Sequence, residues 1–125
     1  MSYTITISEN GQYIICLVTG PITVEIVREF SREIDSLSRA KNIKRLLTDV
    51  REAPNISSIY QNYEYAYQDM KNLKLQRDIR SAILAKPADT THDFVETVVR
   101  NAGYNVRIFH DKSAAIAWLN EKTSS

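Results

Sequence analysis

The sequence has few of the residues that form disulfides and flexible linkers, and it has no apolar run long enough to span a membrane. Its 125 residues include one cysteine, three glycines and three prolines. The single cysteine, Cys16, excludes an internal disulfide and fits a reducing compartment. No apolar run approaches the roughly 20 residues that span a bilayer, and residues 1–7 lack the basic and apolar blocks of a secretory signal. We therefore expect a soluble, cytoplasmic protein without membrane insertion.

Charge is balanced along the chain, which argues against a partner chosen by net charge. There are 16 basic and 15 acidic residues, so no global field attracts nucleic acid or an anionic membrane. Two local basic clusters, residues 41–45 and 71–80, lack the Gly-rich loop or interleaved aromatics of phosphate and nucleic-acid sites. The composition, 43% hydrophobic and 25% charged, is that of a globular protein, and the length fits one domain over residues 1–125.

Apolar spacing predicts two strands followed by a helix. Residues 3–7 alternate polar and apolar side chains, which indicates a strand with one wet face. The pair Asn10-Gly11 is a strong hairpin signal because both residues tolerate positive φ. Residues 13–18 are almost wholly apolar, which predicts a strand covered on both faces. Thr23 can cap the amphipathic helix that follows, whose apolar residues recur at spacings of three and four.

The rest of the chain alternates strands and helices. The later strands are expected at residues 43–50, 79–85 and 106–109, and the later helices near residues 57–70, 90–102 and 112–119. Such alternation implies right-handed crossovers and parallel pairing. The predicted class is therefore α/β, in the order β-β-α-β-α-β-α-β-α, with a mainly parallel sheet and an antiparallel first strand.

Three short stretches, together with this element order, resemble a known family. Residues 19–23, Thr-Gly-Pro-Ile-Thr, form a glycine turn before the first helix, and residues 46–50 form an apolar strand that ends in Asp. The chain closes with a strand and a short helix, with an Ala-x-x-Trp-Leu type of ending at Ala115 to Leu119. These features resemble the STAS family of bacterial anti-sigma-factor antagonists and sulfate-transporter domains, and a divergent, mostly uncharacterised STAS-like branch. The CRAL-TRIO lipid-binding fold has a related arrangement.

The resemblance implies a site at the carboxyl end of the central strand. Asp49 and Arg51 lie there, where open α/β sheets usually meet ligands and partners. Antagonist members are phosphorylated on a serine in an Asp-Ser-x-Gly motif, which falls here on Ser58, with Ser57 and Tyr60 at the Asp and Gly positions. A phosphate at a helix N-terminus would meet free N–H groups, with Arg51 as a further contact. The simpler interpretation is that one serine only caps the helix.

The predicted second helix is rich in tyrosine. It carries four of the seven in the chain: Tyr60, Tyr63, Tyr65 and Tyr67. At 100° per residue, Tyr60, Tyr63 and Tyr67 share an inward face, and Tyr65 lies off it. Because tyrosine suits half-buried surfaces, we expect this tyrosine helix to pack against a partner or to line an apolar pocket. The alternative is ordinary core with one exposed ring.

Groups able to do chemistry are few and scattered. Asp49 could bind a cation or orient a catalytic group, but capping the following loop through backbone N–H groups is the simpler interpretation. Cys16 is expected to be an inert core residue. His92 and His110 match no metal-ligand spacing, although His110 shares the strand-carboxyl side with Asp49. We expect no catalytic residue, no cofactor and no metal.

These observations favour a regulatory module that acts by binding. The expected partner is a protein, with a second copy of the chain, in a homodimer, as one candidate. The alternative is a carrier or sensor of a small apolar or amphipathic ligand, held in a CRAL-TRIO-like pocket between the sheet and the tyrosine helix. An enzyme that uses Asp49 and His110 is a third hypothesis, disfavoured because no nucleophile–base pair is visible.

Overall fold

The elements of the computed structural model follow the predicted order. It describes residues 3–55, 61, 64–69, 71 and 75–121. The elements are β1 (Tyr3–Ile7), β2 (Ile14–Thr19), α1 (Val24–Lys41), β3 (Arg45–Glu52), the π-helical turn η1 (Tyr65–Asp69), β4 (Arg80–Leu84), α4 (Asp93–Asn101), β5 (Asn105–Phe109) and α5 (Lys112–Asn120). Half of the predicted tyrosine helix, residues 57–70, lies outside the described residues, and η1 is its longest described stretch.

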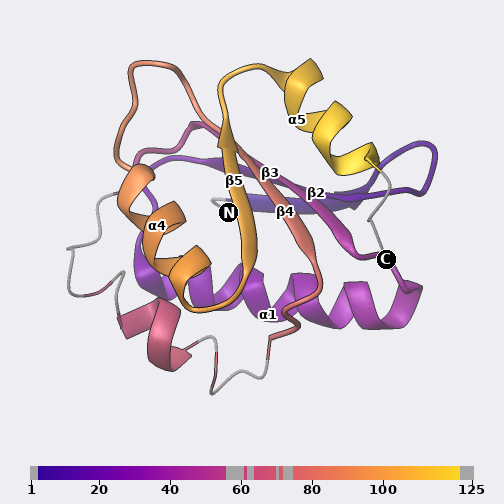
Figure 1. Ribbon diagram of the computed structural model, residues 1–125, viewed down its shortest axis with the longest axis horizontal. Helices are drawn as coiled ribbons and strands as arrows, with labels where there is room; N and C mark the ends of the chain where they lie inside the picture. Colours follow the sequence, from indigo (N-terminus) through magenta and orange to yellow (C-terminus); the bar gives the residue numbers. More distant parts are fainter. Residues whose placement is uncertain (1–2, 56–60, 62–63, 70, 72–74, 122–125) are drawn as a thin grey trace.

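A five-stranded mixed sheet forms the centre of the molecule, and its strands lie in chain order from β1 to β5. β1 is antiparallel to β2, while β2, β3, β4 and β5 pair in parallel. This confirms the predicted α/β class and the antiparallel first strand. In Figure 1 the sheet runs between α1 and α5, which lie on opposite sides of it.

Helix α1 forms as its sequence predicts. Thr23 is the N-cap, and its Oγ1 accepts the Ile26 N–H at 3.4 Å. Phe30 and Ile34 are buried against the sheet, since they lie one turn apart on the same face of the helix. The helix ends at Asn42, whose φ of 54° places it in the left-handed region that asparagine tolerates well.

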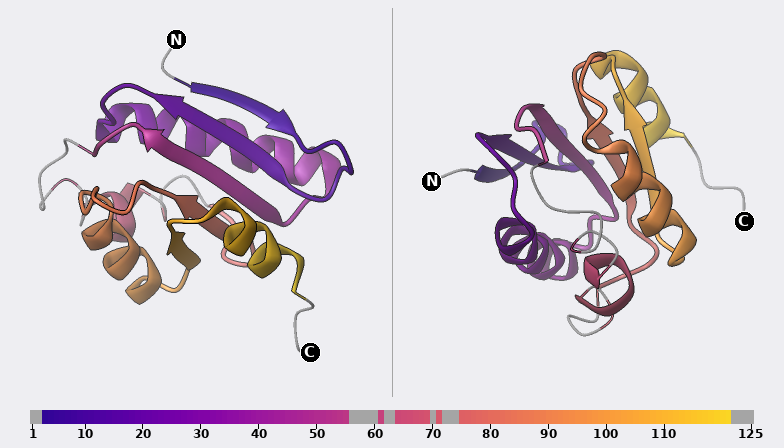
Figure 2. Two further views of the ribbon diagram at one scale, coloured as in Figure 1. Left: turned by 90° about the horizontal axis from the view of Figure 1, so that it is seen from above. Right: turned by 90° about the vertical axis from the view of Figure 1, so that its left-hand side faces the viewer.

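Side-chain alternation divides the core between the two faces of the sheet. One face, called here the α1 face, carries buried or half-buried residues from every strand and is covered by α1, η1 and α4. The other face, the α5 face, is covered by α5 over β3 and β4. Its core is Leu47, Ala82, Leu84, Ala115 and Leu119. Figure 2 shows α5 over only part of the sheet, at the end away from β1.

Because α5 covers only part of the sheet, the prediction that β2 is buried on both faces was wrong. The strand was expected to be covered on both faces, but its burial alternates, with Ile14, Cys16 and Val18 buried and Leu17 41% exposed. α5 does not extend over β2, so the α5 face of this strand meets solvent. An apolar sequence was therefore an unreliable sign of two-sided burial.

The hairpin predicted at Asn10-Gly11 is present, since β1 and β2 pair antiparallel. Of the two residues only Gly11 adopts a positive φ, in a loop longer than two residues. Helix α4 begins later than predicted, with His92 at its N-cap and no side-chain capping bond. In the turn before it, Asp89 accepts the Thr91 N–H at 2.9 Å. None of the described helices has both the length and the apolarity needed to cross a membrane.

Candidate functional site

The carboxyl end of β3 carries an exposed, geometrically fixed ion pair. Asp49 and Arg51 are two residues apart on one strand, so their side chains lie on the same face of the sheet. The Arg51 guanidinium donates through Nε to Asp49 Oδ1 at 3.0 Å and through Nη2 to Oδ2 at 2.8 Å. The Arg51 side chain is 45% exposed and that of Asp49 is 14% exposed. The pair therefore presents a two-pronged salt bridge whose cationic member faces solvent.

The Asp49 carboxylate also accepts a hydrogen bond from the backbone of Arg51. Its Oδ1 accepts the backbone N–H of Arg51 at 3.2 Å, which matches the capping interpretation made from the sequence. Partial burial favours a higher pKa for Asp49, but the hydrogen bonds from Arg51 outweigh it and hold the pKa below its usual range. Asp49 is therefore an ionised carboxylate that Arg51 already occupies, which does not suit a general base.

Asp49 and His110 do not share a partner. β4 lies between the strands that carry them, which places the two strands roughly 10 Å apart. The His110 Nδ1 lies 3.0 Å from the carbonyl oxygen of Ala85. Each side chain thus has its own hydrogen-bond partner. Within the described residues, no group of three or more His, Cys, Asp or Glu is placed to hold a metal ion.

The chain that leaves β3 is held from both sides. The carbonyl oxygen of Ala53 lies 2.9 Å from His92 Nε2, and the Asn55 N–H donates to Thr91 Oγ1 at 2.9 Å. On the other side the Ile22 N–H donates to the Pro54 carbonyl oxygen at 2.8 Å. These contacts fix where residues 53–55 leave the sheet.

The candidate serines and half of the candidate tyrosines cannot be placed. Ser57, Ser58, Tyr60 and Tyr63 lie outside the described residues. Tyr65 and Tyr67 are described, and the prediction for both was wrong. Tyr65 is 7% exposed and Tyr67 is 38% exposed, the reverse of the expected orientation. Residues 65–69 form a π-helical turn, and Tyr65 takes the inward side, where its hydroxyl pairs with Ser31 Oγ.

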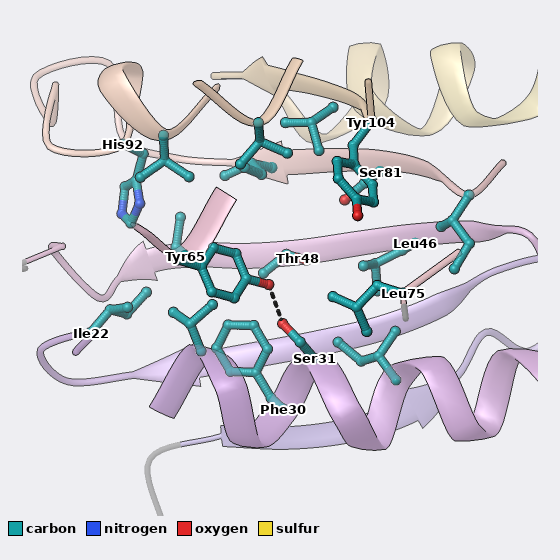
Figure 3. Close-up of a pocket in the computed structure, with 18 of the residues that line it drawn as sticks. Ile22, Phe30, Ser31, Leu46, Thr48, Tyr65, Leu75, Ser81, His92 and Tyr104 are labelled. Atoms are coloured by element: carbon teal, nitrogen blue, oxygen red, sulfur yellow. Dashed lines mark hydrogen bonds between the residues drawn. The ribbon is translucent and has the colours of Figure 1, made fainter. Parts of the chain in front are cut away.

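An apolar cavity of about 170 Å³ lies between the α1 face of the sheet and the segments that cover it. Tyr65 lines it from η1, Phe30 from α1, Val99 from α4 and Val106 from β5. The Tyr65 hydroxyl pairs with Ser31 Oγ at 2.6 Å and so ties η1 to α1 across one side of the cavity (Figure 3). A pocket between the sheet and the tyrosine helix is the feature that the ligand hypothesis requires.

One residue of this cavity was missed by the sequence analysis. Tyr104 precedes β5 and is 7% exposed. Within the described part of the chain, its hydroxyl is a buried polar atom without a hydrogen-bond partner. The signal was present in the sequence, because Tyr104 alternates with Val106 and Ile108, which places all three on one face of the last strand.

Comparisons with known proteins identify the fold. No family profile and no curated protein sequence matches the chain. An anti-sigma factor antagonist from Mycobacterium paratuberculosis superposes with a TM-score of 0.60 at 12% identity, over 96% of each chain. An uncharacterised protein of the DUF3478 family from Shewanella loihica, described as having a SpoIIAA-like fold, gives 0.57 at 19% identity, over 94% of this chain and 91% of the other.

The fold is STAS-like. It is shared over nearly the full length of both structures, as the sequence resemblance led us to expect. The comparisons lend no support to the CRAL-TRIO resemblance. At identities of 12% and 19% the likeness establishes architecture alone.

Proposed function

We propose that this chain, as a single domain over residues 1–125, is a non-enzymatic regulatory module that binds a protein partner. The observation that carries the proposal is the full-length match to a solved anti-sigma factor antagonist, a protein whose name denotes action on another protein. The STAS-like arrangement puts the carboxyl ends of β3, β4 and β5 at one edge of the sheet. Such edges are where open α/β sheets usually meet their ligands.

The proposed contact, called here the carboxyl-end surface, comprises Asp49, Arg51, Glu52, Lys86 and His110. Arg51 and Glu52 are exposed at the end of β3, and Lys86 follows β4 with its Nζ 3.7 Å from Glu52 Oε1. Exposed ion pairs of this kind contribute little to stability. They do bias the choice and orientation of a partner, since charge complementarity acts mainly on specificity and association rate.

Binding suits this surface better than catalysis. The groups that an enzyme would use here already have partners: Asp49 is held by Arg51 and His110 lies against the Ala85 carbonyl. Cys16 is fully buried on the α1 face, away from this surface. A reaction mechanism would need one of these groups released, whereas a protein interface can use the surface as it stands.

The test is quantitative affinity capture from the host with three full-length baits: wild type, Arg51→Glu and Arg32→Glu. Arg32 is an exposed arginine on α1, so its reversal matches the charge change on a different surface. We expect one partner to be enriched by wild type and Arg32→Glu and to be reduced at least tenfold by Arg51→Glu. Equal recovery of every protein by the three folded baits contradicts the proposal.

The regulatory part of the proposal concerns Ser58. Phosphorylation of Ser58 would add about −1.5 to −2 charges. If Ser58 begins the second helix, as the sequence predicts, the phosphate would compete with Asp49 for the Arg51 guanidinium. We expect Ser58→Asp to change recovery of the same partner while Ser58→Ala leaves it unchanged. A Ser58→Asp bait that recovers every partner as wild type does removes the phosphoswitch.

A second copy of the chain is one candidate partner. Tyr67, which is 38% exposed, would then lie at the interface, since tyrosine is favoured at such surfaces. Sedimentation equilibrium of the wild-type chain should show a concentration-dependent dimer. A monomer at all concentrations removes this form of the proposal and leaves a different protein as the partner.

A further inference from the structure

The cavity on the α1 face has the features of a binding site for a small neutral molecule. Its wall is mainly aliphatic and aromatic, formed by residues such as Phe30, Ile83 and Val99. Side chains from the sheet, α1, η1 and α4 all contribute, and a cavity shared between elements is typical of small-molecule sites. Its volume of about 170 Å³ is close to that of apolar cavities, about 150 Å³, that bind benzene.

The cavity contains an unsatisfied polar group. Tyr104 is more than nine-tenths buried, and its hydroxyl has no hydrogen-bond partner among the described residues. Figure 3 shows this hydroxyl directed into the cavity, whose lining also includes Ser81 and Tyr65. The ring is held in place, because Arg77 stacks on it at 4.8 Å and the Tyr104 N–H donates to the Val99 carbonyl. A buried hydroxyl left unpaired costs free energy, which a ligand oxygen placed there would recover.

The charges around the cavity select against ions. No lysine or arginine is among the described residues that line it, and its one carboxylate is Asp35. That carboxylate is already occupied: Oδ1 accepts the Gln76 backbone N–H at 3.2 Å and side-chain Nε2–H at 3.1 Å, and Oδ2 accepts from Arg39 at 2.7 Å. An anionic ligand would therefore lack a cation, and a cationic ligand would lack a free carboxylate.

The volume of the cavity also limits the size of the ligand. A cavity of about 170 Å³ holds one aromatic ring or an equally compact aliphatic group, by comparison with the benzene case. A phospholipid or a long acyl chain is several times larger. The volume therefore favours a small amphipathic molecule over a lipid.

We propose that this cavity binds a neutral, single-ring-sized molecule whose one oxygen pairs with the Tyr104 hydroxyl. The apolar body of the ligand replaces the empty volume beside Phe30, Ile83 and Val99. The site joins α1, η1 and α4, so an occupant stabilises the packing of these segments on the sheet. This site is independent of the carboxyl-end surface, and neither proposal needs the other.

Phenol and toluene test the proposal directly, because they match in shape and differ in a hydroxyl against a methyl group. Binding to the full-length chain is followed by ¹H–¹⁵N NMR titration. For wild type we expect phenol to bind roughly three- to tenfold more tightly than toluene, the range that one net hydrogen bond gives. In Tyr104→Phe that preference should vanish, with toluene affinity retained.

Two further variants keep the result interpretable. Tyr13→Phe makes the same chemical change in the α5-face cluster and should leave both affinities unchanged. Ser81→Leu adds bulk inside the cavity and should abolish binding of both probes, while the NMR spectrum confirms that the chain is folded. Shifts confined to Tyr104, Val106 and their neighbours support the site.

The outcomes that overturn the proposal are specific. If neither probe binds folded wild type up to its solubility limit, the cavity is empty or holds water only. If phenol binds Tyr104→Phe as tightly as wild type, the hydroxyl does not recognise the ligand. If Ser81→Leu binds both probes unchanged, they bind elsewhere on the chain.

Discussion

Burial decides which single side chains are able to react, and Cys16 is the clearest case. Its side chain is 0% exposed at the centre of β2. Burial, with a smaller contribution from the charge of Glu33, raises the pKa of the Cys16 thiol to about 12. At pH 8 almost no thiolate is present, and the thiolate is the reactive species.

We therefore predict that Ellman's reagent does not label Cys16 in the folded protein at pH 8. In 8 M urea the same chain should release one equivalent of the chromophore. Native labelling within minutes, at a rate close to that in urea, would mean that the α1-face core opens readily and would contradict the packing described here.

We expect the ionisation of Asp35, a residue of the cavity wall, to make the stability of the protein depend on pH. Its side chain is 14% exposed. Burial alone would raise the pKa of Asp35, but hydrogen bonds from Arg39 and Gln76 outweigh it and lower the pKa below 3.8, its ordinary value. A lowered folded-state pKa adds stability that is complete well above pH 3.8 and is lost as the pH falls through the folded-state pKa.

The variant Asp35→Asn should therefore be less stable than wild type at pH 7, by about 1 kcal/mol given the solvent exposure of the pair. As the pH falls below 3.8 toward 2, the difference should shrink, because wild type loses the charge that the variant never had. Urea unfolding at pH 7 and pH 3 measures both values. A difference that grows on acidification would contradict the sign of the pKa shift.

Sequence patterns predicted some single residues and failed on others for identifiable reasons. Thr23 as a cap and Asp49 as a backbone acceptor follow from local chemistry, and both were found. Tyr65 and Tyr67 lie on opposite sides of their segment, and which side is buried depends on contacts such as the Tyr65–Ser31 pair, which spacing does not report. The face of Tyr104 follows from its alternation with Val106 and Ile108, but the lack of a partner for its hydroxyl among the described residues depends on elements far apart in the chain.

At the level of whole elements, β2 shows that the burial of a strand depends more on which helices pack over it than on how apolar its sequence is. Neighbouring residues Leu17 and Val18 lie on opposite faces, and Leu17 is 41% exposed while Val18 is fully buried. α5 covers β3 and β4 but does not reach β2. The two positions thus offer a matched pair within one strand.

Replacing each residue with threonine separates the two faces. Val18→Thr buries a hydroxyl without a prepared partner and should destabilise the protein by about 1–3 kcal/mol. Leu17→Thr places a β-branched residue, which strands favour, on a solvent-facing surface and should change stability by less than about 1 kcal/mol. Thermal or urea unfolding decides between them. Equal losses at both positions would mean that the α5 face of β2 is covered in solution.

Elements were easier to predict than their ends. Periodicity identified the strands and the helices α1, α4 and α5 because each must bury one apolar stripe. The hairpin after β1 was predicted correctly but its loop is longer than two residues, and α4 starts later than predicted, since several residues near each end can bond the same backbone groups. The strand order β1 to β5 arises from long-range pairing, on which the sequence is silent.

For the whole molecule, the fold could be predicted and the site only in outline. The alternation of strands and helices, with short STAS-like stretches, was enough to indicate the architecture that the solved structures then matched. It also located the carboxyl end of β3, where Asp49 and Arg51 meet. The cavity could not be predicted in detail, because its wall combines residues from elements far apart in the chain.

The central claim is that a protein partner binds the carboxyl-end surface, and an NMR footprint tests it most directly. The captured partner is purified and titrated into ¹⁵N-labelled full-length chain, and the amide shift changes are mapped. The account predicts that they cluster at residues 49–55, 85–92 and 110–112. Changes concentrated at the opposite end of the sheet, at residues 9–12, 41–45 and 76–80, would contradict it.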